Sequence, residues 1–284
     1  MTTPKEIIRQ HGIRPRKKLG QSFLLDKNII QKIAAVADIS KDDLVLEIGS
    51  GIGVLTEEFA AKARRLIAVE LDEKLSELLK DKLARYDNVE IYNTDILKFD
   101  FGSLSDKYKT KIKVVGNVPY NISSPLIFYL LSYRRAIRDF VLMLQKEVVE
   151  RLVAAPVNKS YGVPSVILQM FAEVEKVLDV PATCFYPQPK VESAVIKSAF
   201  REKPLVALAD EEFFIKLVRA SFAQRRKMLM NNLKSSTLFS SWTEEKLKNA
   251  LGIASIDGKR RAETLSVEEF GYLANILKTK ELDG

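Results

Sequence analysis

Cysteine and histidine are nearly absent from this chain of 284 residues, which contains one of each, Cys184 and His11. A disulfide needs two cysteines and a Cys/His zinc site needs about four ligands, so both are excluded and we expect no metal centre. Ser-His-Asp or Cys-His catalysis would have to use His11, which lies in a polar N-terminal segment, and is not expected. The low cysteine content is typical of a reducing compartment and favours a cytoplasmic protein.

Long apolar segments are also missing. No hydrophobic run reaches the roughly 18 residues that a transmembrane helix requires, so we expect no membrane span. The first residues, MTTPKEIIRQHG, lack the apolar core of a secretory signal. They also lack the Arg- and Ser-rich, acid-free composition of an organelle presequence, which again favours the cytoplasm.

The net charge of +8 is concentrated at the two ends of the chain. Residues 1–18 contain six basic side chains and a single acid, Glu6. A second block, residues 213–234, contains no acid, and its basic residues are Lys216, Arg219, Arg225, Arg226, Lys227 and Lys234. A solvated helix face normally intersperses Glu or Asp with its basic residues, so we interpret both blocks as surfaces for a polyanion such as RNA.

Short apolar runs alternate with helix-like segments through the first half of the chain. Strands, rich in β-branched residues or Leu, are predicted at 44–48, 66–70, 89–93, 112–116 and 139–144. Helices, with apolar residues at helical spacing, are predicted at 27–38, 54–62, 72–84, 122–133 and 145–154. This alternation predicts an α/β fold with a Rossmann-like, mostly parallel sheet.

The pattern changes after about residue 170. Segments 173–180 and 191–200 are separated by the proline-rich stretch PATCFYPQPK and predict two antiparallel edge strands joined by a rigid loop. Beyond Pro204 helices are predicted at 210–222, 224–234, 243–250 and 266–278. We therefore divide the chain into a basic N-terminal arm, a sheet domain and a small all-α C-terminal domain, at 1–18, 19–204 and 205–284.

A glycine-rich turn, EIGSGIGVLT, follows the first predicted strand, with glycines at 49, 51 and 53. Glycines here allow backbone N–H groups to approach a ligand at the carboxyl edge of a sheet. The G-x-G-x-G spacing differs from the G-x-G-x-x-G of dinucleotide-binding proteins, so a nicotinamide cofactor is disfavoured. Alone, the turn is weak evidence for any ligand, because a purely structural turn has the same composition.

Acidic residues follow the next two strands. Glu70 ends the second strand, where a carboxylate can accept hydrogen bonds from both hydroxyls of a ribose. Asp95 and Ile96 follow the third strand, and an Asp at this edge can accept a hydrogen bond from the amino group of adenine. With the glycine turn, these acids indicate a ligand that has ribose and adenine but no evident phosphate, and S-adenosylmethionine fits.

The fourth strand ends in GNVPYN, which contains no strong acid, base or nucleophile, so we expect it to position a substrate. The side chain of Asn117 and the carbonyl of Val118 could accept hydrogen bonds from an adenine amine and localise its lone pair. Pro119 would stiffen the loop, and Tyr120 would stack on the base. Phe185, in the proline-rich stretch, could stack on the other face of an extruded base.

These stretches resemble the KsgA (RsmA) family of small-subunit ribosomal RNA adenine dimethyltransferases. Asn117-Val-Pro-Tyr120 is similar to the N-[LIV]-P-[YF] motif of adenine N6-methyltransferases. Further similar stretches are KLGQSFL (18–24), FYPQPKVESAV (185–195), FAQRRK (222–227) and RAETL (261–265). The resemblance covers nearly the whole chain and implies a class I methyltransferase domain that uses S-adenosylmethionine.

The resemblance implies that a monomeric enzyme transfers two methyl groups to each of two adjacent adenosines. These lie in the 3′-terminal hairpin loop of the small-subunit rRNA and are modified while the 30S subunit assembles. The cofactor contacts it implies are Gln21, Ser22, Leu24, Gly49, Gly51, Glu70, Asp95, Ile96 and Asn117. The RNA contacts expected are Arg16, Lys17 and Lys18 in the arm, and Arg225, Arg226 and Lys227 on a basic helix. Ser22 departs from the Asn that is frequent in the family, which puts one side-chain contact to the cofactor in doubt.

Other functions remain open. Large-subunit rRNA adenine dimethyltransferases of the antibiotic-resistance type share the Asn117-x-Pro-Tyr120 and cofactor motifs, and only the tail, with QRRK and RAETL, resembles the small-subunit branch. A non-catalytic RNA-binding assembly factor could use the same scaffold, although it would not need an intact Asn-Pro-Tyr triplet. A methyltransferase acting on pyrimidine carbon 5 would need a thiol nucleophile, and Cys184 has no neighbouring cation in the sequence to lower its pKa.

Overall fold

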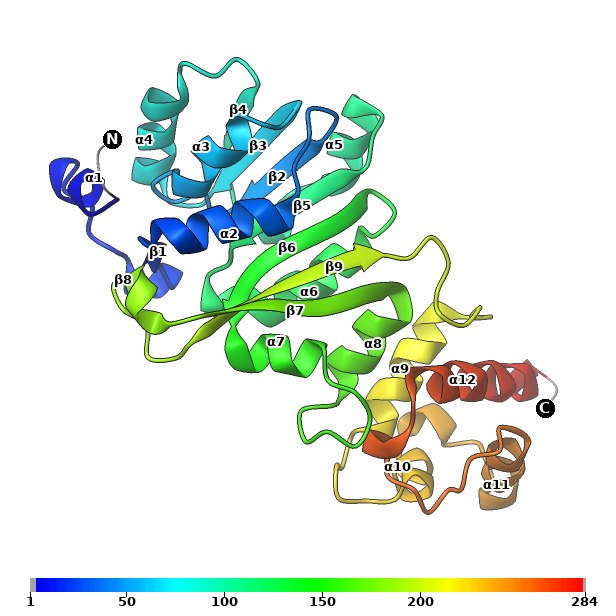
Figure 1. The fold of residues 1–284 in the computed structure, drawn as a ribbon. Helices are drawn as coiled ribbons and strands as arrows, with labels where there is room; N and C mark the ends of the chain where they lie inside the picture. The colour runs from blue at the N-terminus through cyan, green and yellow to red at the C-terminus, as the bar shows by residue number, and fades with distance from the viewer. Residues whose placement is uncertain (1–3, 283–284) are drawn as a thin grey trace. The chain divides into compact units, whose positions relative to one another are not determined.

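The computed structural model describes residues 4–282, and a seven-stranded sheet is its largest element (Figure 1). The strands are β2 (Leu44–Ile48), β3 (Arg65–Glu70), β4 (Val89–Asn93), β5 (Ile112–Asn117), β6 (Ile137–Gln145), β7 (Ala172–Val180) and β9 (Ser193–Phe200). Their order is β4-β3-β2-β5-β6-β9-β7. The first five in this order run parallel, and β9 pairs antiparallel with β6. The predicted mostly parallel sheet with an antiparallel edge is confirmed.

Helices cover both faces of this sheet, and Figure 1 shows α2 in front of the strands and α6 behind them. The helices in the first half of the chain are α1 (Pro4–Gln10), which belongs to the N-terminal arm, α2 (Lys27–Ala37), α3 (Val54–Ala60), α4 (Glu73–Leu83), α5 (Phe101–Tyr108), α6 (Ser123–Ser132) and α7 (Lys146–Leu152). Side-chain caps fix where two of them begin: Asp26 accepts hydrogen bonds from the N–H groups of Asn28 and Ile29, and Asp72 accepts one from Lys74. The parallel strands and these helices together form the α/β layer that the alternation predicted.

The remaining helices form a second compact unit. They are α8 (Val163–Phe171), α9 (Glu211–Ser221), α10 (Leu229–Lys234), α11 (Glu244–Ile253) and α12 (Val267–Leu282). One unit comprises residues 1–149 and 175–200, and the other comprises 150–174 and 201–284. The division expected from sequence kept 150–174 with the sheet domain. In the structure α8 packs instead against α9 and α12, for example through the edge-to-face pair Phe171–Phe214, so the two units interleave along the chain.

The arm at the N-terminus packs against the sheet unit. Helix α1 buries Ile8 in a cluster with Phe23, Ile52, Leu75 and Leu78. Burial of an aliphatic side chain of this size stabilises the contact by about 1.5–3 kcal/mol, so this segment has an apolar anchor as well as basic residues. Between residues 4 and 282, no helix combines the length and the apolar character needed to cross a membrane.

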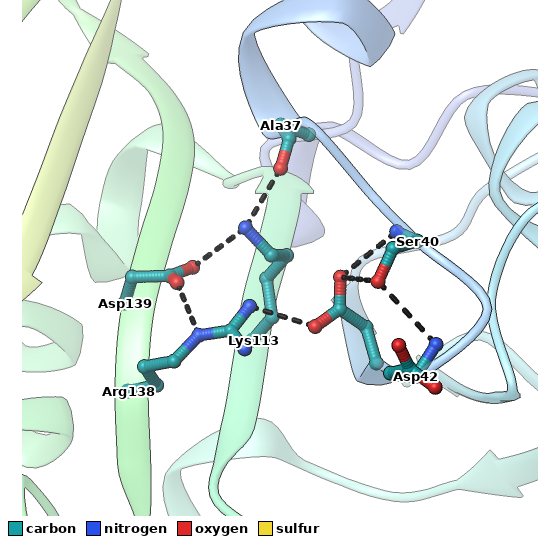
Figure 2. A network of polar contacts seen from close by, with 7 residues as sticks. Ala37, Ser40, Asp42, Lys113, Arg138 and Asp139 are labelled. Atoms are coloured by element: carbon teal, nitrogen blue, oxygen red, sulfur yellow. Dashed lines mark hydrogen bonds and ion pairs between the residues drawn. The ribbon is translucent and has the colours of Figure 1, made fainter.

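A buried polar network joins the amino ends of three strands, as Figure 2 shows. The ammonium of Lys113 on β5 donates to the carbonyl of Ala37 at 2.8 Å and pairs with Asp139 on β6 at 3.2 Å. Arg138 bridges Asp139 at 2.8 Å and Asp43, which precedes β2, at 2.7 Å. Because Lys113 is only 5% exposed, these partners replace the water that its ammonium would otherwise bind, and the network joins the amino ends of the three strands. The carboxyl ends of the same strands lie at the opposite edge.

Candidate cofactor and substrate site

A cavity lies at the carboxyl ends of the parallel strands, where the sequence predicted a ligand. We call it the sheet-edge cavity. It is lined by residues 19–23, 48, 49, 51, 69–71, 75, 94–96 and 117–122. The structure thus brings together the glycine turn after β2, the acids after β3 and β4, and the N-V-P-Y loop after β5. The lining also includes the segment 19–23, which lies far away in the sequence and contains Gln21 and Ser22, two residues that the resemblance had implied at the cofactor.

Gly49 sets how closely the glycine turn and the N-V-P-Y loop approach. Its φ of +66° lies in the left-handed region, which L side chains rarely adopt. A Cβ atom at this position would lie 3.3 Å from the carbonyl oxygen of Asn117 and 3.7 Å from Cδ of Pro119. The backbone conformation therefore favours glycine here, and any larger residue would also crowd the neighbouring loop.

Glu70 is held rigidly at the wall of the cavity and is only 6% exposed. One carboxylate oxygen accepts the N–H of Gly51 at 2.8 Å, and the other accepts the N–H of Asp72 at 2.9 Å. Each carboxylate oxygen has two acceptor positions, so each can still accept one further hydrogen bond. Burial raises the pKa of Glu70 despite the opposing effect of these N–H groups. The arrangement suits a ligand that presents two hydroxyl groups.

Asp95 lies beyond β4 on the same wall. One of its oxygens caps the short 3-10 helix Ile96–Lys98 by accepting the N–H of Leu97 at 3.0 Å. Its second oxygen has no hydrogen bond within residues 4–282 and can accept one from an amino group of a ligand. Ile96 is buried beside it and gives the cavity an apolar surface.

Asn117 is oriented by a main-chain carbonyl. Its amide nitrogen donates to the carbonyl oxygen of Ser22 at 2.9 Å. Because a carbonyl can only accept, the amide must turn its NH₂ group to Ser22, which leaves the oxygen Oδ1 for another donor. The N–H of Val118 donates to Met143 at 3.1 Å, whereas its carbonyl accepts no hydrogen bond from the described part of the chain. Two neighbouring acceptors are therefore available on residues that line the cavity.

Tyr120 and Pro119 also line the cavity. The phenol of Tyr120 shares a 2.6 Å hydrogen bond with the hydroxyl of Ser193. Burial raises the pKa of Tyr120, so the phenol stays protonated at neutral pH. A neutral phenol offers a flat surface and not a base, in agreement with a positioning role.

Two of the expected site residues lie outside the cavity lining. Leu24 and Phe185 pair across the short strands β1 (Phe23–Leu24) and β8 (Phe185–Tyr186), and both are buried in the apolar core. Side chains alternate along a strand, so Phe23 lies on the other face from Leu24 and lines the cavity. Tyr186, next to Phe185, is 45% exposed. Of the two residues of β1, Phe23 is therefore the one whose side chain lines the cavity.

The segment before β1 is tied to the cavity through Asp72. The side chain of Gln21 donates to Asp72 at 3.2 Å and accepts the N–H of Arg16 at 2.7 Å, and the guanidinium of Arg16 pairs with the same carboxylate at 3.1 Å. Arg16, expected to bind RNA, thus has a partner inside the protein. Lys18 is exposed, and the side chain of Lys17 lies outside the described part.

The basic turn in the helical unit differs from the sequence expectation. Residues 225–227 form a turn before α10 and do not belong to a helix, so the predicted basic helix is wrong. The buried amide of Asn232 holds this turn by bonding the carbonyls of Ser221 and Gln224. Arg225 pairs with Glu263 at 2.7 Å and also contacts the carbonyl of Lys159.

Unlike Arg225, the next two basic residues of this turn have no partner among the described residues that neutralises them. Arg226 and Lys227 are exposed, and neither has an acidic partner in the described chain. They are consequently available to a polyanion, whereas the guanidinium of Arg225 connects parts of the helical unit.

Two further residues at the site, Glu47 and Leu71, were not predicted to have a role. Glu47 lies on β2 below the glycine turn and is only 2% exposed; burial raises its pKa to about 7, while the hydroxyls of Thr56 and Ser50 oppose this shift. Leu71 is 51% exposed and lines the cavity directly after Glu70. An apolar residue following the strand-end acid was the available signal for Leu71. Burial also raises the pKa of Cys184, so this thiol is not an activated nucleophile.

The fold and the site together define a class I methyltransferase, with a glycine turn, strand-end acids and an Asn-Pro-Tyr loop around one cavity. The chain belongs to the ribosomal RNA adenine dimethylase family, whose sequence model matches residues 12–279. The resemblance to the KsgA (RsmA) branch is confirmed by relatives named ribosomal RNA small subunit methyltransferase A. The protein of that name from Syntrophus aciditrophicus is 43% identical over 281 residues, covering 98% of this chain and 99% of the relative. The one from Bacillus pumilus is 44% identical over 277 residues, covering 96% and 95%.

Solved structures show the same relationship. A dimethyladenosine transferase from Plasmodium falciparum has a TM-score of 0.76 at 28% identity, covering 91% of this chain and 98% of that one. The 23S rRNA methyltransferase ErmE has a TM-score of 0.71 at 26% identity, covering 90% and 99%. Both similarities extend over nearly the whole chain, so they include the helical unit as well as the sheet.

Proposed function

We propose that this protein uses S-adenosylmethionine to dimethylate N6 of two adjacent adenosines in the 3′-terminal hairpin loop of small-subunit rRNA. The reaction accompanies assembly of the 30S subunit in the cytoplasm, and the protein acts as a monomer. The observation that carries the proposal is the fixed amide of Asn117, whose oxygen is left free beside a cavity suited to an adenosyl ligand. The small-subunit relatives at 43–44% identity support the choice of RNA.

The lining of the sheet-edge cavity fits S-adenosylmethionine chemically. It contains the two acids Glu70 and Asp95 and, among the described residues, no Lys or Arg. Such a lining favours hydroxyl groups, an amine and a positive sulfonium over a phosphate. Phe23, Leu71 and Ile96 provide apolar surface for a purine. When bound, the cofactor supplies an electrophilic methyl group on its sulfonium.

Individual residues then have distinct roles in holding the cofactor. The carboxylate of Glu70, already fixed by two N–H groups, would accept the two ribose hydroxyls. The second oxygen of Asp95 would accept the adenine amino group. Because both acids are fixed by main-chain hydrogen bonds before the ligand arrives, little ordering is required on binding.

The N-V-P-Y loop would activate the target amine. The lone pair of adenine N6 is delocalised into the ring, so the nitrogen is a poor nucleophile. If the oxygen of Asn117 and the carbonyl of Val118 accept the two amino hydrogens, they favour a pyramidal nitrogen with a localised lone pair. Tyr120 would support the base with its ring. Both acceptors are in place before reaction, so they stabilise the developing charge without reorganisation.

Large-subunit rRNA is the alternative substrate. ErmE, named as a 23S rRNA methyltransferase, shares the fold at 26% identity, well below the identity of the small-subunit relatives.

In the helical unit, the exposed cations Arg226 and Lys227 would bind RNA phosphate, with Arg225 fixing the turn that carries them. Affinity for RNA should then fall steeply with salt.

The proposal is tested by incubating the protein with labelled S-adenosylmethionine and with small or large ribosomal subunits that lack the modification. We expect the label as N6,N6-dimethyladenosine at two adjacent positions near the 3′ end of the small-subunit rRNA. Label in large-subunit rRNA, or on a pyrimidine, would overturn the proposal. Replacing Cys184 with Ser serves as a control and should leave the product unchanged.

A further inference from the structure

The proline-rich loop between β8 and β9, residues 187–192, is attached at both ends to the lining of the sheet-edge cavity. At its start, the hydroxyl of Ser22 donates to the carbonyl of Pro187 at 2.7 Å. At its end, the hydroxyl of Ser193 bonds the phenol of Tyr120 at 2.6 Å. Ser22 and Tyr120 both line the cavity, on different segments. Two lining segments therefore hold the loop, in addition to Lys146, which pairs with Glu192 near the end of the loop at 2.8 Å.

Ser22 holds two functional parts at once. Its main-chain carbonyl accepts the amide of Asn117 at 2.9 Å, and its side chain holds Pro187. One residue thus sets the direction of the Asn117 amide and the start of the loop. The hydroxyl of Ser22 gives its single hydrogen to the loop, so it acts there as a donor.

The loop presents side chains that suit an RNA strand. Tyr186, immediately before it, is 45% exposed, and Val191 is 46% exposed. Lys190 is exposed and has no acidic partner among the described residues. Aromatic and apolar surface beside a free cation is the combination that contacts bases and phosphates of single-stranded nucleic acid.

We infer that Ser22 is a positioning residue that couples this loop to Asn117, so that the RNA strand and the target base are aligned together. The inference rests on the proposed function, and it assigns the Ser22 hydroxyl to substrate alignment instead of cofactor binding. Loss of the hydroxyl should loosen the loop from Pro187 onward, while Tyr186 keeps its strand pairing with Phe23. The base would then reach the acceptors of Asn117 less often, although the cofactor would bind as before.

The test compares Ser22→Ala and Ser22→Thr with the wild-type protein. In Ser22→Ala, kcat/KM for undermethylated small subunits should fall about three- to tenfold, as expected for one lost hydrogen bond. The Kd for S-adenosylmethionine should stay within about twofold, and Ser22→Thr, which keeps the hydroxyl, should restore kcat/KM. Ser132→Ala is a matched control, because its hydroxyl also donates to a main-chain carbonyl at 2.7 Å but lies at the end of α6 and outside the cavity lining.

A second readout does not depend on activity. Trypsin should cleave after Lys190 faster in Ser22→Ala than in wild type, with Ser22→Thr and Ser132→Ala near wild type, at equal thermal stability. A tenfold loss of cofactor affinity in Ser22→Ala with unchanged cleavage would assign the hydroxyl to the cofactor and overturn the inference. Wild-type kinetics and cleavage in Ser22→Ala would overturn it as well. Failure of the wild-type protein to methylate adenosine would instead refute the proposed function.

Discussion

Substitution of Glu70 by Gln tests how the cavity binds its cofactor. The two N–H groups of Gly51 and Asp72 reach different oxygens of the Glu70 carboxylate. A Gln amide has one oxygen and one NH₂ group, so only one of the two N–H groups keeps an acceptor. The other N–H group then faces the NH₂ group of the Gln side chain, which is also a donor. One ribose hydroxyl loses its acceptor for the same reason.

The expected magnitude follows from these contacts. A hydrogen bond to a charged group contributes about 1.5–3 kcal/mol, and one such bond to the ligand is lost. We therefore expect Glu70→Gln to weaken S-adenosylmethionine binding by about 2 kcal/mol, which corresponds to roughly 30-fold in Kd. Since burial raises the pKa of Glu70, wild-type affinity should also fall as the pH is lowered towards the acid range, a dependence that the Gln variant should lack.

Isothermal titration calorimetry at several pH values measures both effects, with circular dichroism to confirm that the variant is folded. Glu77→Gln is a suitable control, because Glu77 is exposed on α4 and outside the cavity lining. A folded Glu70→Gln protein that binds S-adenosylmethionine with wild-type affinity would refute the role given to this carboxylate.

Three further predictions concern the rest of the molecule. Because the pKa of Glu47 is raised from 4.5 to about 7 in the folded state, its contribution to stability is present below pH 4.5 and is lost as the pH rises to about 7. Between pH 4.5 and 7 the free energy of unfolding, measured by urea denaturation, should fall by about 3 kcal/mol through Glu47 in the wild-type protein, and this part of the fall should be absent in Glu47→Gln. The same pH dependence in both proteins would contradict the raised pKa of Glu47. Lys113→Met should lower the free energy of unfolding by about 3 kcal/mol, because the largely buried Asp139 then keeps only the half-exposed Arg138 as a partner. Addition of Asp139→Asn should recover part of this loss, and wild-type stability of the single variant would be inconsistent with the network. Arg226→Ala should weaken binding to small subunits and reduce the slope of log K against log salt by about 0.9, while Arg225→Ala should mainly lower the melting temperature of the helical unit; the reverse pattern would exchange their roles.

Much of the sheet could be predicted from the sequence because local signals and tertiary structure agree there. The run 89–93 was predicted as a strand and is β4 (Val89–Asn93), and 44–48 is likewise β2 (Leu44–Ile48). The helices predicted at 27–38 and 72–84 start next to Asp26 and at Asp72, and both residues act as side-chain caps in the structure. Since parallel strands have their carboxyl ends at one edge, the glycine turn and both acids could be placed at a common site.

Other features depend on contacts that a sequence pattern does not contain. The helix predicted at 224–234 begins only at Leu229, because the side chain of Asn232 fixes the preceding residues as a turn. Helix α8 was missed because VPSVILQMF is apolar and rich in β-branched residues, a composition shared with strands. In the short segment at β1, Leu24 was expected at the cofactor, but strand alternation brings Phe23 to the cavity. A shift of the strand by one residue exchanges the faces on which Phe23 and Leu24 lie, and the composition of the segment does not determine which of them faces the cavity.

The contribution of segment 19–23 likewise could not be derived from spacing. Its position depends on the side chain of Gln21 and on Arg16, which both bond Asp72, 51 residues further along the chain from Gln21. The carbonyl of Ser22 then orients Asn117, 95 residues away. These contacts between residues distant in the sequence place the segment, and the bond from Asn117 to the Ser22 carbonyl determines which atom of the amide is free.

The central claim is that the oxygen of Asn117 accepts a hydrogen from the target amine and activates it. The most direct measurement is the single-turnover rate of methyl transfer by Asn117→Ala at saturating S-adenosylmethionine and undermethylated small subunits, together with the Kd for the cofactor. We predict that the rate falls about a hundred- to thousandfold, as when one preorganised acceptor or donor is removed from an active site, while the cofactor still binds. A rate equal to that of the wild-type protein would contradict the claim.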